Sequence, residues 1–180
     1  MNYIINSFRS SNQYMRENAV KYAIKYALNP NPAYRFLGFH GDGGGDCSNF
    51  ISQCLRAGGA PMAYDSIGPW WYKGNGGKND RWSVSWAVAH SLYWTLKIRG
   101  YKNLPGLKGI EVPDIDILEL GDLIQYENAG GRIYHSTIIT GFTVQKGIKE
   151  PLISQHSFNG LNIYYIKPAA SRMHFMKIKI

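Results

Sequence analysis

The spacing of apolar positions predicts three helices in the first hundred residues. Apolar side chains recur every three to four residues in three segments, 14–28, 47–55 and 84–99. Polar residues that are suited to N-capping precede the first segment: Ser10, Ser11 and Asn12. The prolines of "NPNPAY" end that helix, and glycines follow the other two, at Gly58-Gly59 and at Gly100.

The pattern changes near Leu120, where the chain becomes rich in short β-type runs. These runs contain many Ile, Tyr, Thr and Val residues and are separated by Gly, Asn and Pro: "DLIQYE", "IYHSTIITGFTV", "LISQHSF", "NIYYIKP" and "HFMKIKI". Short links between successive strands predict an antiparallel sheet. We therefore expect an α+β fold with N-terminal helices packed on a C-terminal antiparallel β-sheet, formed by one domain over residues 1–180.

Charge and composition narrow the class of protein. The chain has 44% hydrophobic and 18% charged residues, which is typical of a soluble globular protein, and no run suits a membrane helix. The net charge of +8 predicts attraction to polyanions, with anionic cell-wall polymers, a membrane surface or nucleic acid as alternatives. The basic residues are scattered singly, however, so we expect a solvated basic surface and no nucleic-acid partner.

No signal peptide is evident at the N-terminus, and this leaves localisation open. The protein is secreted or associated with the cell wall if a leader was removed, and otherwise cytoplasmic. The oligomeric state is equally open.

The two cysteines are predicted to be free thiols with different roles. Cys47 and Cys54 are seven residues apart on one predicted helix, a rise of roughly 10.5 Å that exceeds the Cα separation a disulfide tolerates. Cys54 lies about two turns into the helix among apolar residues, so we expect it to be buried and inert.

Cys47, in contrast, sits at the predicted helix N-terminus, directly after "GDGGGD". Unpaired backbone N–H groups and the helix dipole favour a thiolate at that position and can also stabilise an oxyanion. The glycines 43–45 remove side chains that would keep a substrate from the sulfur. This pattern indicates a nucleophile.

A nucleophilic thiol needs a base, and the strand half supplies two candidate histidines. His135 in "IYHSTIIT" and His156 in "ISQHSFNG" are isolated polar residues in sheet-like runs. Neighbouring antiparallel strands would place the two imidazoles side by side. Trp70 and Trp71, in the glycine-rich loop "GPWWYKGNGGKNDRW", are candidate stacking surfaces for a peptide or sugar ring.

Four segments together resemble the Putative amidase domain family: "GDGGGDCSNFISQCLRAGGAPM", "GDLIQYE", "YHSTIITG" and "SQHSFN". That family is similar to the NlpC-type branch of papain-like cysteine hydrolases. The resemblance covers nearly the whole chain and implies a papain-like or NlpC-like α+β fold without cofactor or metal.

The resemblance also implies roles for individual residues. Cys47 matches the nucleophile, His135 the base, and His156 the third residue, which orients the base; Asn159 is the alternative for that third role. Asp46 and Ser48 flank the nucleophile, with Asp46 as a candidate N-cap, and Tyr34 matches a tyrosine that lines the site. Gly121-Asp122 matches the pair that opens the first core strand.

The function implied is hydrolysis of an amide bond by Cys47 and His135, in bacterial peptidoglycan or a related peptide. Three alternatives remain open at this point. Cys47, His135 and His156 suit zinc, although a fourth ligand is not evident. A basic, non-catalytic wall-binding module and an acyltransferase on the same fold are the other two.

Overall fold

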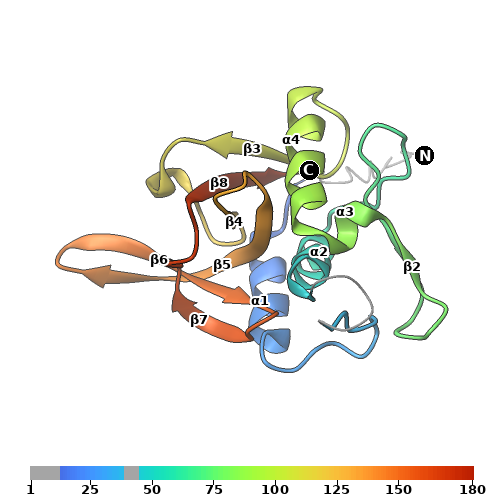
Figure 1. Cartoon of the computed structure of the whole chain (residues 1–180), viewed down its shortest axis with the longest axis horizontal. Helices are drawn as coiled ribbons and strands as arrows, with labels where there is room; N and C mark the ends of the chain where they lie inside the picture. Colours follow the sequence, from blue (N-terminus) through green and yellow to red (C-terminus); the bar gives the residue numbers. More distant parts are fainter. Residues whose placement is uncertain (1–12, 39–44) are drawn as a thin grey trace, which may run out of the picture.

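The computed structural model describes residues 13–38 and 45–180, which form an α+β structure (Figure 1). Its α-helices are α1 Arg16–Tyr26, α2 Cys47–Ala57, α3 Val84–Ala87 and α4 Ala89–Tyr101, and a 3-10 turn, η1, covers Ile115–Ile117. Its strands are β1 Tyr72–Lys73, β2 Arg81–Trp82, β3 Lys108–Val112, β4 Leu123–Glu127, β5 Ile133–Gln145, β6 Ile148–Gln155, β7 Gly160–Tyr164 and β8 Arg172–Lys179.

The predicted antiparallel sheet is confirmed and has six strands in the order β3-β8-β4-β5-β6-β7. Strands β4 to β7 follow one another, as the short links predicted. The last strand, β8, inserts between β3 and β4, and it pairs antiparallel with both. The predicted pattern did not include β3 or the small β1–β2 hairpin, which lies in the tryptophan-rich segment.

Helices cover one face of this sheet and shorter segments cover the other (Figure 1). On the helix side, Phe50, Ile51 and Cys54 of α2 share a hydrophobic core with strand residues such as Ile138 and Met176. The opposite face carries a smaller cluster made of Leu118, Ile124, Tyr126, Ile139 and Ile153. The sheet therefore buries both faces, which explains the apolar runs in its central strands.

The predicted first helix begins later than its candidate caps indicated. Helix α1 starts at Arg16, after Met15, which makes no side-chain capping bond. The predicted caps, Ser10 to Asn12, lie outside the described residues. The second helix begins at Cys47 as predicted and stops before Gly58, and Gly59 then adopts a φ of +92°.

The predicted third helix is divided in two. Val88 is extended, with φ −110° and ψ 123°, and separates α3 from α4. Four residues at helical spacing on both sides of this break are nevertheless all buried: Trp86, Ala89, Tyr93 and Leu96. Gly100 lies inside α4, one residue before its end, and not beyond it. A Cβ at this position would meet the carbonyl oxygen of Gly109 in β3 at 2.1 Å. The glycine thus permits close packing of α4 on β3.

Gly121-Asp122, the pair predicted to open the first core strand, directly precedes β4, and Asp122 connects three parts of the chain. Asp122 is fully buried, and its Oδ1 accepts hydrogen bonds from the Arg16 guanidinium of α1 at 2.6 Å and from the Ile178 N–H of β8 at 2.9 Å. Its Oδ2 accepts from the Glu119 N–H at 2.9 Å.

No helix in the described part of the chain is long and apolar enough to span a membrane.

Asp122→Ala is expected to lower the free energy of unfolding by about 2–4 kcal/mol, because it leaves the buried Ile178 N–H without its acceptor and removes the part-buried ion pair with Arg16. Urea unfolding measures this loss. The control is Glu17→Ala, which removes an exposed ion pair with Lys21 on the same helix and should barely move the transition. Equal effects of the two variants would contradict a central role for Asp122.

Candidate active site

Cys47 is the first residue of α2, and a buried carboxylate fixes this end of the helix. Asp46 occupies the N-cap position without the predicted side-chain capping bond to the helix backbone. Its Oδ1 accepts instead from the Leu37 N–H and from the Asn49 side chain, both at 2.7 Å, and its own N–H donates to the Ser157 hydroxyl at 2.6 Å. These bonds hold the residue before the thiol from three directions.

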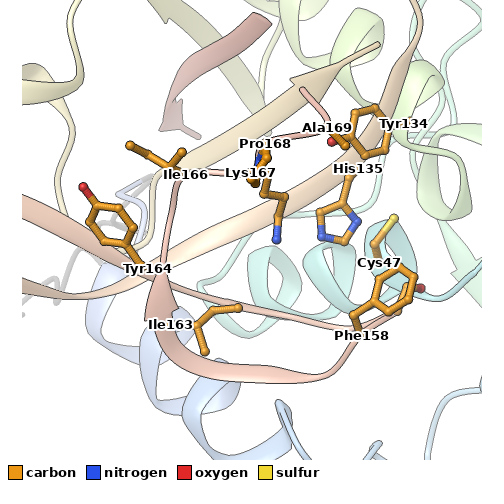
Figure 2. A pocket seen from close by; sticks show the side chains of 11 residues that line it. Cys47, Tyr134, His135, Phe158, Ile163, Tyr164, Ile166, Lys167, Pro168 and Ala169 are labelled. Atoms are coloured by element: carbon orange, nitrogen blue, oxygen red, sulfur yellow. The ribbon is translucent and has the colours of Figure 1, made fainter. Parts of the chain in front are cut away.

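The thiol opens onto a cavity of about 500 Å³ (Figure 2). His135 of β5 shares the wall with Cys47. Tyr134, its neighbour in β5, lines the same wall. The other walls come from the β6–β7 turn, from β7 and from the segment that follows it, and they consist of Ser157, Phe158, Ile163, Tyr164, Ile166, Lys167, Pro168 and Ala169. The predicted nucleophile and base therefore meet at one largely apolar cavity.

Gln155 of β6 fixes the orientation and the tautomer of His135. The imidazole Nε2 lies 2.9 Å from Gln155 Oε1, and the Gln155 amide nitrogen donates to the Phe158 carbonyl at 2.6 Å. A carbonyl only accepts, so the amide group must place its NH2 on Phe158 and its oxygen on the imidazole. His135 therefore carries its proton on Nε2, and Nδ1, the nitrogen nearer the sulfur in Figure 2, is free to accept a proton.

Burial keeps both reacting groups uncharged. It lowers the pKa of His135 to about 4, although the Gln155 hydrogen bond raises it, and Lys167 lowers it further. Burial also raises the pKa of the Cys47 thiol, while hydrogen bonds from the Ser136 backbone and from Ser48 lower it. The sequence predicted a thiolate favoured by the helix terminus; in the structure burial raises the pKa of Cys47 instead, so the resting pair is thiol and imidazole.

The prediction that His156 orients His135 is wrong. Its Nδ1 lies 2.5 Å from Asp46 Oδ2 and its Nε2 lies 2.7 Å from the Tyr26 carbonyl oxygen, while the ring stacks on Phe50. His156 thus joins the end of α1 to the start of α2. It contacts Asp46, the residue next to Cys47, and makes no hydrogen bond with His135.

Strand register explains this difference. Ile138 of β5 opposes Ser154 of β6, so the two share a face. Side chains alternate along a strand, which puts His135 and Gln155 together on the other face, whereas His156 lies one residue beyond the end of β6. Sequence reasoning missed Gln155, and only the register could have identified it.

The remaining predicted residues occupy different surroundings. Ser48 is buried, with its hydroxyl 3.9 Å from the Cys47 sulfur and 3.5 Å from the Ser136 hydroxyl. Asn159, the alternative third residue, is exposed in the β6–β7 turn, and His135 bonds to Gln155 instead. Tyr34 packs between Tyr72 and Trp86 and does not line the cavity.

The tryptophans predicted to bind substrate do not reach this cavity either. Trp70 is fully buried, and its indole N–H donates to the Ser52 hydroxyl at 3.0 Å. Trp71 is half-buried and stacks on Tyr64. The glycine-flanked pair is therefore divided between the core and a surface contact.

The zinc alternative finds no support in the side-chain arrangement. Both ring nitrogens of His156 already bond to Asp46 and Tyr26, so the imidazole does not converge with Cys47 and His135. Within residues 13–38 and 45–180, no three His, Cys, Asp or Glu side chains are grouped to hold a metal ion.

Of the glycines predicted to leave the sulfur open to substrate, Gly45 adopts a φ of +113°, and Gly43 and Gly44 lie outside the described residues.

Cys54 and Cys47 are both free thiols, as predicted. Cys54 is completely buried in the core beneath α2, and burial raises its pKa well above the usual range of a thiol. The prediction that this residue is buried is therefore confirmed.

The low pKa of His135 should make stability pH-dependent. In the unfolded chain this imidazole takes up a proton near pH 6.5, whereas in the folded protein it does so only near pH 4. The free energy of unfolding should therefore fall as the pH decreases from 6.5 to 4, with His135 contributing up to about 3 kcal/mol of the loss. Thermal melting of His135→Gln should show a shallower decline in this window, and an unchanged decline would contradict the assignment.

Comparison with known proteins places the chain in a family. The family model described as Putative amidase domain matches residues 13–177. The chain is 36% identical over 161 residues to the uncharacterized protein YhbB of Bacillus subtilis, covering 88% of this chain and 46% of that protein. It is 31% identical over 153 residues to the uncharacterized protein YjcM of the same species, covering 81% of this chain and 31% of that protein.

The chain thus spans less than half the length of these curated relatives. No solved structure matches it. The family match extends over both the helices and the sheet, including Cys47, His135 and Gln155. The chain belongs to the Putative amidase domain family.

Proposed function

We propose that this protein is a cysteine hydrolase that cleaves an amide bond, with Cys47 as nucleophile and His135 as general base. One observation carries the proposal: the thiol and the imidazole line the same cavity, and Gln155 holds the imidazole in the tautomer whose Nδ1 accepts a proton. Membership of an amidase family supports the choice of an amide as the bond that is cleaved.

The third residue of this proposed site is Gln155, so the group is Cys-His-Gln in place of the Cys-His-His that the sequence suggested. An amide oxygen that accepts from Nε2 orients the ring and stabilises the imidazolium that forms during the reaction. His156 is a positioning residue that acts through Asp46.

The proposed reaction begins with an uncharged pair. As the Cys47 sulfur attacks the amide carbon, its proton passes to His135 Nδ1, and a tetrahedral oxyanion forms. The imidazolium then protonates the leaving nitrogen, the C–N bond breaks, and a thioester remains on Cys47. Water attacks that thioester, its proton passes to His135, and the acid product leaves with the thiol restored.

Backbone N–H groups at the start of α2 are suited to stabilise the oxyanion. In a helix the first N–H groups have no intrahelical acceptor, and in α2 the Phe50 N–H donates to the carbonyl of the N-cap residue Asp46 at 2.9 Å. The Cys47 N–H therefore precedes the hydrogen-bonded part of the helix, next to the sulfur. This is the geometry in which an attacked carbonyl oxygen would meet a donor.

The substrate we propose is a peptide amide of bacterial peptidoglycan or a related peptide. The resemblance to NlpC-type, papain-like hydrolases supports this choice, and so does the net charge of +8, which favours anionic polymers. We propose that the whole chain, residues 1–180, serves as one catalytic domain of this kind.

Incubation of purified peptidoglycan with the protein tests the proposal, with fragments identified by mass spectrometry. The wild type should release fragments with new amine and carboxyl ends, and Cys47→Ala should release none. His135→Ala should lower the rate by about 10²–10⁴-fold, and Gln155→Ala by a smaller factor, mainly through kcat. His156→Ala should chiefly lower the free energy of unfolding.

Cys54→Ala is the matched control, because it removes a thiol from the same helix without touching the cavity. It should lower stability modestly and retain activity. Fragments released equally by wild type and Cys47→Ala would contradict the proposal.

Alkylation tests the coupling of thiol and imidazole without any substrate. Iodoacetamide should modify Cys47 in the native protein well before Cys54, because Cys54 is completely buried. His135→Ala should slow the reaction of Cys47 at neutral pH, since a thiol with a raised pKa then lacks its proton acceptor. Identical pH–rate profiles for wild type and His135→Ala would show that the two groups are not coupled.

A further inference from the structure

Lys167 gives the cavity beside Cys47 a single permanent charge. Of the described residues that line this cavity, it is the one cation, and none is an aspartate or a glutamate. The surrounding walls include the exposed apolar side chains of Phe158, Ile163 and Ile166. Apolar walls lower the local dielectric, so a charge here acts more strongly than it would on an open surface.

This lysine has no acidic partner among residues 13–38 and 45–180. None of the ion pairs in this part of the chain includes Lys167, whose ammonium instead lies 5.3 Å from the centre of the Tyr126 ring. Burial lowers the pKa of the ammonium, which reflects the cost of holding it half-buried without a counter-charge. Lys97, by contrast, pairs with Glu111 at 2.6 Å.

The ammonium lies on the imidazole side of the reacting pair. In Figure 2 the Lys167 side chain extends into the cavity toward His135, and the imidazole lies between it and the Cys47 sulfur. The positive charge of Lys167 also lowers the pKa of His135. In the proposed reaction His135 protonates the leaving nitrogen, so the leaving half of the substrate must also occupy this side.

We propose that Lys167 binds a carboxylate carried by the amino acid on the leaving side of the cleaved amide. The preferred substrates would then be N-acyl amino acids and peptides in which the residue after the cleaved bond bears a free carboxylate. This inference rests on the proposed function for the direction of cleavage. The carboxylate forms no covalent bond; it pairs with the ammonium while the leaving nitrogen lies near Nδ1.

The same ion pair would assist the chemistry. An unpaired Lys167 opposes the positive charge that His135 acquires when it takes the thiol proton. A bound carboxylate neutralises the ammonium and removes that opposition, so substrates with the carboxylate should gain in kcat as well as in KM. A neutral analogue would leave the cation unpaired and the base weaker.

The charge of the alkylating reagent tests the anion site without requiring hydrolysis. Iodoacetate and iodoacetamide both alkylate the Cys47 sulfur and release iodide, but only iodoacetate carries a carboxylate. The rate with iodoacetate divided by the rate with iodoacetamide should fall on the order of tenfold in Lys167→Met, relative to the wild type. Lys149→Met is the matched control, because that lysine also lies over an aromatic ring, Phe142, yet does not line this cavity.

The ratio in Lys149→Met should equal that of the wild type. An equal ratio in wild type and Lys167→Met would overturn the proposed anion site, whatever the protein hydrolyses. A ratio that falls only in Lys167→Met supports the site even if amide hydrolysis is never found, so the two proposals can fail separately.

Hydrolysis of three model substrates then tests the direction of binding. An N-acyl alanine offers an α-carboxylate, an N-acyl glutamic acid α-amide offers a side-chain carboxylate, and an N-acyl alaninamide is neutral. The wild type should favour one of the two carboxylate substrates over the neutral one by about tenfold or more in kcat/KM. Lys167→Met should lose this preference, Lys167→Arg should keep most of it, and an unchanged preference in Lys167→Met would contradict the proposal.

Discussion

The buried carboxylate of Asp46 is the interaction on which the arrangement of the site depends. It accepts from the Leu37 backbone and from Asn49 one turn along α2, and its Oδ2 lies 2.5 Å from Nδ1 of His156 in the turn after β6. Three parts of the chain thereby meet at the residue that precedes Cys47. A negative charge next to a thiol raises its pKa, as Asp46 does for Cys47. The carboxylate therefore fixes the position of Cys47 and at the same time favours the protonated thiol.

Burial of α2 from its first residue to Leu55 explains why the polar residues of this helix differ from those of a surface helix. Every residue from Cys47 to Leu55 is buried, so each polar side chain needs a partner inside the protein. Ser52 accepts from the Trp70 indole and donates to the Trp86 carbonyl, and Gln53 accepts from the Tyr22 hydroxyl. Trp70 is thus held in the core by the same helix that presents the thiol. The block "DCSNFISQC" combines the proposed nucleophile with a set of buried hydrogen bonds.

The sequence was informative where local chemistry decides the structure. Periodicity predicted α2 and the strands that carry His135 and Gln155, because apolar spacing reflects burial on one element. The pairing of Cys47 with His135 followed from residue types that serve one reaction. The residue that bonds to His135 could not be predicted in this way. His156 and Gln155 are neighbours in sequence, and only strand register decides which of them shares a face with His135. Similarly, the extended Val88 interrupts a helix whose apolar spacing continues across the break, and β3 pairs with β8 through contacts about seventy residues apart.

Desolvation at the cavity has opposite consequences for the resting and the reacting protein. It keeps Cys47 protonated and His135 neutral, so the pair is less reactive than the helix terminus alone would make it. The same low dielectric strengthens any charge interaction formed during the reaction, including that of Gln155 with an imidazolium and that of Lys167 with an anion. The unpaired ammonium opposes formation of the imidazolium until a counter-charge arrives. In the proposed mechanism, an anion that pairs with Lys167 would therefore favour proton transfer from the Cys47 sulfur to the His135 imidazole more than a neutral ligand would.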